Sequence, residues 1–148
     1  MNVNLAEAEK VIQAAKKKAA EIKVPMNIAV VDRGSNLVAF SRMDNAWLGS
    51  VDIAFKKAKT ANFFDMNSGE IGKLSQPGEA LYGIEVTNGG LVSFPGGVVL
   101  KNSEGEIIGY LHFMCTHLLI FHRHSSFNCK GSQSDKKIML TVRLLQNQ

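Results

Sequence analysis

A strand–turn–strand–helix pattern over residues 27–61 constrains this 148-residue chain more than any other segment. Two apolar runs rich in β-branched residues, 26–31 and 37–42, flank the turn sequence Asp-Arg-Gly-Ser-Asn. We therefore predict an antiparallel hairpin with a five-residue loop. The Ala- and Lys-rich segment 51–62 carries apolar residues at helical spacing and predicts a helix. The corner before this helix holds an Arg and an Asp, which can bind a small ligand or a neighbouring subunit.

The remaining predicted elements surround this block. Residues 4–23 form an amphipathic helical pattern that opens with a capping-box pair, Asn4 and Glu7. Further along we predict a short helix at 68–74 and strands at 91–94, 97–100 and 106–110. Strands joined by tight turns pair antiparallel, so the order predicts a one-domain α+β fold with a mainly antiparallel sheet and helices packed on it.

The net charge of +4 comes entirely from the last 38 residues. Residues 1–110 hold 12 basic and 12 acidic side chains, so the body has no basic excess, and this argues against a nucleic-acid-binding protein. The start shows no secretory pattern, and the apolar run 111–121 is only 11 residues long and contains two histidines, too short to cross a bilayer. We expect a cytoplasmic protein without a membrane partner. Both cysteines lie after residue 110, so we expect no disulfide framework in the body.

Three motifs carry a family resemblance. They are Arg-Met-Asp at 42–44, Lys-Ala-Lys-Thr-Ala at 57–61 and Phe-Pro-Gly-Gly at 94–97. Over about residues 4–110 the chain resembles the GlcG/HbpS haem-degrading-domain family, which also includes the C-terminal domain of PduO-type proteins. The resemblance implies a profilin-like fold with a central antiparallel sheet flanked by helices. It also implies small homo-oligomeric proteins, some of which bind haem or other tetrapyrroles and some of which are linked to haem degradation.

The chain departs from the family pattern after Tyr110. Family members continue into a Gly/Ser-rich segment and a final helix, whereas 111–148 holds all four histidines and both cysteines. We predict a truncated family domain at 1–110 and an atypical tail at 111–148, with the C-terminal helix missing or replaced through a frame shift, a retained intron or alternative splicing. A sheet face without its helix would favour association or misfolding.

Arg42 and Asp44 are the first candidate ligand-binding residues. The guanidinium of Arg42 offers five donors suited to a carboxylate, such as a haem propionate or a small organic acid, and Asp44 can orient it. A structural salt bridge at the corner, or a contact between subunits, is the competing interpretation. Alanine at position 42 should weaken ligand binding without unfolding the protein if the first interpretation holds.

The second group of candidates lies on the helix and in the Phe-Pro-Gly-Gly motif. Lys56 and Lys59 can pair with propionates and Thr60 can donate a hydrogen bond, although exposed lysines and a small packed Thr are the commoner explanation of this pattern. The motif permits close backbone approach, which suits a flat ligand or a tight structural bend. Its members are Phe94, Pro95, Gly96 and Gly97.

Haem iron needs an axial ligand, usually His, Cys, Met or Tyr. Residues 1–111 contain neither His nor Cys, which leaves five conventional candidates: Met26, Met43, Met66, Tyr82 and Tyr110. The tail holds a cluster that can ligate Zn²⁺, at spacings unlike an ordinary zinc finger. This cluster comprises His112, Cys115, His117, His122 and His124.

Three functions are compatible with these residues. The first is a small oligomeric protein that binds haem or a related tetrapyrrole and assists its degradation. The second is a non-catalytic structural or interaction protein of the same fold, and the third is a weak enzyme acting on a small organic acid. Residues 1–111 hold no histidine, no nucleophile elbow and no P-loop, which argues against a hydrolase or kinase.

Overall fold

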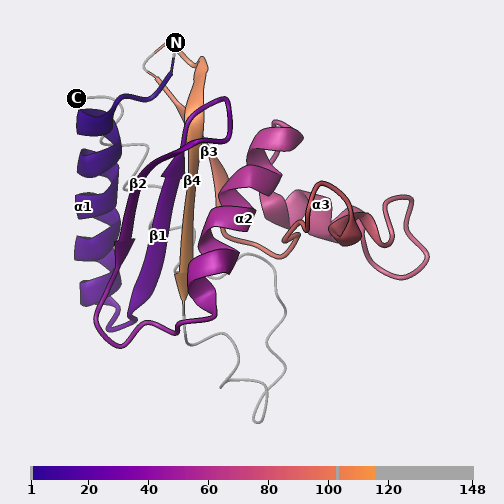
Figure 1. Cartoon of the computed structure of the whole chain (residues 1–148), viewed down its shortest axis with the longest axis horizontal. Helices are drawn as coiled ribbons and strands as arrows, with labels where there is room; N and C mark the ends of the chain where they lie inside the picture. The colour runs from indigo at the N-terminus through magenta and orange to yellow at the C-terminus, as the bar shows by residue number, and fades with distance from the viewer. Residues whose placement is uncertain (1, 103, 116–148) are drawn as a thin grey trace.

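The helices and strands follow one another along the chain in the order that the sequence predicts, except that the strand predicted at 91–94 does not form. The computed structural model describes residues 2–102 and 104–115 (Figure 1). The elements are α1 (Leu5–Glu21), β1 (Met26–Val31), β2 (Leu37–Arg42), α2 (Ser50–Phe63), α3 (Ser68–Leu74), a 3₁₀ turn η1 (Ile84–Val86), β3 (Gly97–Lys101) and β4 (Ile107–Cys115).

The four strands form one antiparallel sheet in the order β2-β1-β4-β3. The predicted hairpin is confirmed, with Asn27 opposite Arg42 at its open end. Strand β4 lies between β1 and β3 and runs to Cys115, five residues further than predicted. Its last residues pair with the start of β1, where Met26 faces Cys115 across the ladder. The division of the chain at residue 110 stays a prediction.

Helices cover both faces of the sheet, as Figure 1 shows with α1 and α2 on opposite sides of the strands. Successive strand residues point to opposite faces. Ile28 and Val30 accordingly pack with α1, whereas Val31 packs with Ala58 of α2 and with Tyr110. All six residues of β1 are buried, as expected of a strand covered on both faces. The α+β fold predicted from the sequence is confirmed.

The predicted capping box at the start of α1 is present. The side chain of Asn4 accepts the N–H of Glu7, and the carboxylate of Glu7 accepts the N–H of Asn4, both at 2.9 Å. Two backbone donors that the first turn leaves unpaired are thereby satisfied.

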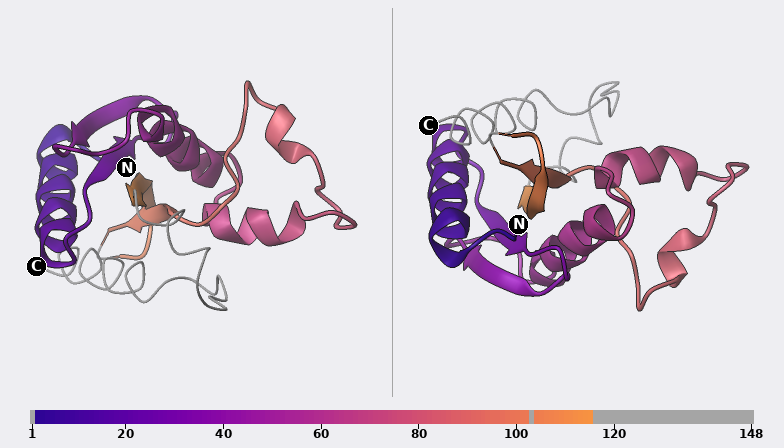
Figure 2. Two further views of the ribbon diagram at one scale, coloured as in Figure 1. Left: turned by 90° about the horizontal axis from the view of Figure 1, so that it is seen from below. Right: turned by 90° about the horizontal axis from the view of Figure 1, so that it is seen from above.

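The predicted strand at 91–94 is wrong. Residues 91–93 lie in the irregular segment that leaves α3, extends away from the sheet and returns to β3 (Figure 2). The N–H of Leu91 donates to the carbonyl of Glu85 at 2.8 Å, and the N–H of Val92 donates to the hydroxyl of Thr60 at 3.0 Å. Because these donors bond a 3₁₀ turn and a helix side chain, they are not available to a strand ladder.

In the part of the chain that the structure describes, no helix combines the length and the apolar character that crossing a membrane requires.

Candidate functional site

The predicted site residues fall in two separate places. Arg42 and Asp44 lie at the β2–α2 corner, and both are exposed. The N–H of Met43 donates to the carbonyl of Met26 at 3.0 Å, which holds the corner against the sheet. Among the described residues, no ion pair joins Arg42 to Asp44, and no hydrogen bond or ion pair links this corner to the other candidates.

A buried amide lies beneath the same corner. Asn27, opposite Arg42 in the ladder, has no exposed surface, and its Nδ2 donates to the carbonyl of Trp47 at 3.0 Å. Its Oδ1 has no hydrogen-bond partner within the described residues. The sequence analysis missed Asn27, although a lone polar residue in an apolar strand is a visible signal.

The predicted lysines of α2 are engaged with neighbours on the helix surface. The Nζ of Lys56 lies 2.9 Å from the carboxylate of Asp52, one turn earlier. The Nζ of Lys59 lies 5.3 Å and 5.4 Å from the ring centroids of Phe55 and Phe63. Both side chains are half-buried, so each ammonium remains near solvent and within reach of an anion.

Thr60 serves as an anchor inside the fold. It is fully buried, and its hydroxyl donates to the carbonyl of Lys56 at 2.8 Å while it accepts the N–H of Val92. The hydroxyl proton is therefore directed at the helix backbone. Thr60 therefore holds the segment that leads into the Phe-Pro-Gly-Gly turn.

Lys57, which the sequence analysis did not name as a candidate, is the α2 lysine that contacts the Phe-Pro-Gly-Gly turn. It has no exposed surface. Its Nζ donates to the carbonyl of Pro95 at 2.7 Å and lies 3.5 Å from the centroid of the Phe94 ring. The signal was available, because Lys57 falls three residues after Ala54 and four before Ala61, which are both buried.

The Phe-Pro-Gly-Gly turn is clamped between α2 and α3. The hydroxyl of Ser68 donates to the carbonyl of Phe94 at 2.8 Å and accepts the N–H of Gly97 at 2.9 Å. A Cβ on Gly97 would lie 2.3 Å from the carbonyl oxygen of Lys57, and one on Gly72 would lie 2.4 Å from that of Ser93. Glycine is required at both positions because the backbones touch.

The exposure of the motif varies along its length. Phe94 is 38% exposed and Pro95 is exposed, Gly96 is half-buried and Gly97 is buried. The structure thus places this turn against Lys57 of α2, and the segment just before it against Thr60. Lys56 and Lys59 make their contacts within α2 instead, and Arg42 and Asp44 lie apart at the β2–α2 corner.

His112 lies in the core, although the sequence analysis assigned it to the tail. It is fully buried in β4 and faces Gly97 of β3 across the ladder. Burial, together with the nearby Lys57 ammonium, holds the pKa of His112 well below its usual range, so the imidazole is neutral at physiological pH. No group of three metal-ligating side chains occurs in the residues the structure describes. His117, His122 and His124, and the side chain of Cys115, lie outside them.

The five candidate axial ligands differ in access. Met26 is buried against α1, and Met43 and Met66 are half-buried. Tyr110 is fully buried, its hydroxyl donates to Asp65, and burial and this carboxylate together raise the pKa of Tyr110. Tyr82, on the extended segment between α3 and β3, is 69% exposed.

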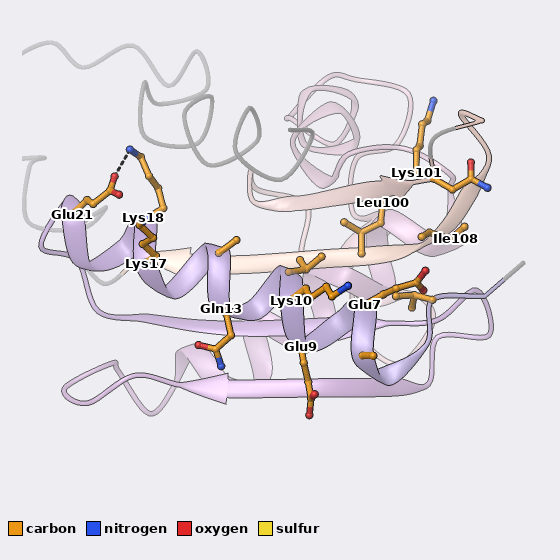
Figure 3. A pocket seen from close by; sticks show the side chains of 15 residues that line it. Glu7, Glu9, Lys10, Gln13, Lys17, Lys18, Glu21, Leu100, Lys101 and Ile108 are labelled. Atoms are coloured by element: carbon orange, nitrogen blue, oxygen red, sulfur yellow. Dashed lines mark hydrogen bonds and ion pairs between the residues drawn. The ribbon is translucent and has the colours of Figure 1, made fainter. Parts of the chain in front are cut away.

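A depression of about 1220 Å³ lies on the α1 side of the sheet, opposite to α2, between α1 and the ends of β3 and β4 (Figure 3). Both acidic and basic side chains line its helical wall, where Lys18 pairs with Glu21 at 2.6 Å. None of the predicted ligand-binding residues lines it. This depression therefore does not join the two candidate regions.

Known relatives align with most of the described residues. The chain is 40% identical over 107 residues to an uncharacterised 15.0 kDa protein encoded in the dhaT–dhaS intergenic region of Citrobacter freundii, covering 72% of this chain and 75% of that protein. It is 37% identical over 112 residues to the corrinoid adenosyltransferase PduO of the same organism. That match covers 75% of this chain but spans only 33% of the length of PduO.

Solved structures extend the likeness to the fold. The protein ORFY of Klebsiella pneumoniae superposes with a TM-score of 0.76 at 31% identity, covering 95% of this chain and 87% of that one. A complex of PduOC with haem superposes with a TM-score of 0.75 at 29% identity, covering 96% and 93%. The family described as haem-degrading protein HbpS-like matches residues 3–113. The chain therefore belongs to the HbpS-like haem-degrading protein family.

Proposed function

We propose that this protein binds haem or a related tetrapyrrole as a small cytoplasmic homo-oligomer and assists the degradation of its ligand. The observation that carries the proposal is the close likeness to the PduOC–haem complex, which extends over 96% of this chain. Family membership supports the same ligand class. A third line of support is the partly exposed aromatic ring of Phe94, which lies on a turn held by two helices.

The described side chains suit the ring and the carboxylates of a tetrapyrrole better than its iron. Phe94 offers an apolar ring, Lys56 and Lys59 offer cations near solvent, and Arg42 offers another at the separate β2–α2 corner. His112 is buried, and Tyr82 is the one widely exposed residue among the five candidate axial ligands. Bound haem would supply redox chemistry at its iron, while the residues of this chain would bind and orient the ring.

Titration with haemin tests the proposal. We expect a saturable shift of the Soret band with haemin, and saturable quenching of the protein's fluorescence with metal-free protoporphyrin IX, because the described side chains suit the ring rather than the iron. Light scattering during the titration measures the oligomeric state. The absence of a saturable signal with both probes, in a folded sample, would leave the non-catalytic structural protein as the better description.

The contribution of Arg42 to ligand binding is tested with a variant of another exposed cation as the control. Arg42→Ala should weaken binding of both probes severalfold while leaving the thermal midpoint unchanged, since Arg42 is exposed and forms no ion pair with Asp44. Lys17→Ala removes an exposed cation from α1 on the other face of the sheet and serves as the control. Equal affinity in the two variants would remove Arg42 from the site.

A further inference from the structure

We propose that Lys57 is a positioning residue that holds the ring of Phe94 as a stacking platform for a planar π-rich ligand. The inference rests on the proposed tetrapyrrole binding and adds to it the contact residue and the buried group behind that residue. Lys57 acts through Phe94 and does not touch the ligand itself, because it has no exposed surface.

The geometry assigns the two faces of the ring different roles. The Nζ of Lys57 lies 3.5 Å from the ring centroid and therefore covers one face. The residue Phe94 is nevertheless 38% exposed, and we infer that the accessible part of its ring is the face turned away from Lys57. A planar ligand can approach this outward face without displacing any group that holds the ring.

The backbone around Phe94 is fixed before any ligand arrives. The carbonyl of Phe94 accepts the hydroxyl of Ser68, and the next carbonyl, that of Pro95, accepts the Nζ of Lys57. A side chain that is already ordered loses little conformational entropy on binding, which favours affinity. A solvent-exposed Phe without a binding role does not require that two successive backbone carbonyls be held by two helices.

The electrostatics favour the same ligand class. An ammonium over one face of an aromatic ring is attracted by the ring quadrupole and polarises its π electrons. The outward face then becomes a better partner for an electron-rich π system, and offset stacking is a preferred arrangement of such rings. His112, the titratable neighbour across the ladder from Gly97, is neutral and adds no competing charge.

Affinity measurements on paired variants test the stacking role. Phe94→Ala should weaken binding of haemin and of metal-free protoporphyrin IX alike, by about tenfold or more, as removal of an aromatic stacking partner does. Phe94→Trp should keep the affinity within about threefold, since it retains a stacking face. Phe63→Ala is the matched control, because Phe63 is 43% exposed at the end of α2 and also faces a lysine, and it should leave the affinity unchanged.

A double-mutant cycle tests the positioning role. Lys57→Met keeps most of the length of the side chain but removes its charge, and it should weaken the binding of both probes about as much as Phe94→Ala does. The double variant should show no further loss of affinity, because each substitution alone already removes the same stacking contact with the ligand. Circular dichroism identifies any variant that fails to fold. If Lys57→Met does not fold, the affinities of the Phe94 variants alone test the inference.

Each failure has a distinct meaning. Wild-type protein that binds both probes, together with a Phe94→Ala variant of equal affinity, would overturn this inference and leave the proposed function intact. A folded Lys57→Met variant with wild-type affinity, beside a weakened Phe94→Ala variant, would refute the positioning role. Wild-type protein that binds neither probe would overturn the proposed function and the inference together.

Discussion

The substitution Gly97→Ala tests the closest backbone approach in the site. Gly97 opens β3, and a Cβ built there would lie 2.3 Å from the carbonyl oxygen of Lys57 and 3.1 Å from the hydroxyl of Ser68. Ordinary contacts begin near 3.4 Å, so helix and strand would have to separate by about 1 Å. The obstacle is backbone, which cannot rotate away as a side-chain tip can.

The expected cost follows from two opposing terms. Overpacking against a rigid neighbour costs about 3 kcal/mol, at the upper end of the usual range. The lower entropy of the unfolded chain after a Gly-to-Ala change returns about 0.7 kcal/mol. The net loss is about 2 kcal/mol, which lowers the urea midpoint by about 1 M for a denaturant slope near 2 kcal/mol/M.

Urea unfolding followed by far-ultraviolet circular dichroism measures this loss. Gly49→Ala is the control, because a Cβ there would meet nothing within 4 Å and the φ of Gly49 is −60°. We expect the control to stay within about 0.5 kcal/mol of the wild type. A Gly97→Ala midpoint equal to that of the control would refute the close approach and, with it, the clamping of the turn by α2.

Two further predictions concern buried titratable groups. Tyr110→Phe should cost about 1 kcal/mol through loss of the hydrogen bond to Asp65. Because the folded-state pKa of Tyr110 is raised, the unfolded state releases its proton first, so wild-type stability should fall above about pH 10 more steeply than that of Tyr110→Phe in urea titrations. His112 has a lowered folded-state pKa, so the unfolded state gains the proton first and stability should fall as the pH drops from about 6.5 to 5, a dependence that His112→Gln should reduce. Parallel pH profiles in variant and wild type would contradict the burial of either group.

Local signals in the sequence were sufficient for the hairpin and for the start of α1. The hairpin depends on two β-branched runs and on one turn between them, and the capping box depends on residues three apart. Each pattern lies within one short stretch of the chain, 26–42 for the hairpin and 4–7 for the cap, so no distant contact can easily override it. The α+β class follows from the same kind of information, because tight turns force neighbouring strands to be antiparallel.

The segment 91–94 shows where local signals end. Leu91 and Val92 have high strand propensity, but their N–H groups bond Glu85 and Thr60, and the pairing partner of β3 is β4. Propensity describes how well a residue fits a pleated surface, and it does not say whether a ladder is open to receive it. The register of the sheet, which is a long-range property, decided the outcome.

Lys57 shows the corresponding limit for the site. A lysine is rarely fully buried unless it has partners, so an exposed position was the reasonable prediction. Its partners are the carbonyl of Pro95 and the ring of Phe94, almost forty residues later in the chain. The sequence nominated the turn and the helix separately, but the hydrogen bond that joins them depends on how α2 and α3 pack. His112 was misplaced for a similar reason, since its burial depends on β4 continuing past Tyr110.

The position of β4 has a consequence for how the protein is made. A nascent chain that ends before residue 107 contains the β1–β2 hairpin and β3, but lacks the strand that lies between them. Both β1 and β3 then present open hydrogen-bonding edges, which are templates for pairing with other chains. The sheet is complete only when β4 has emerged from the ribosome, so until then the nascent chain is most exposed to aggregation.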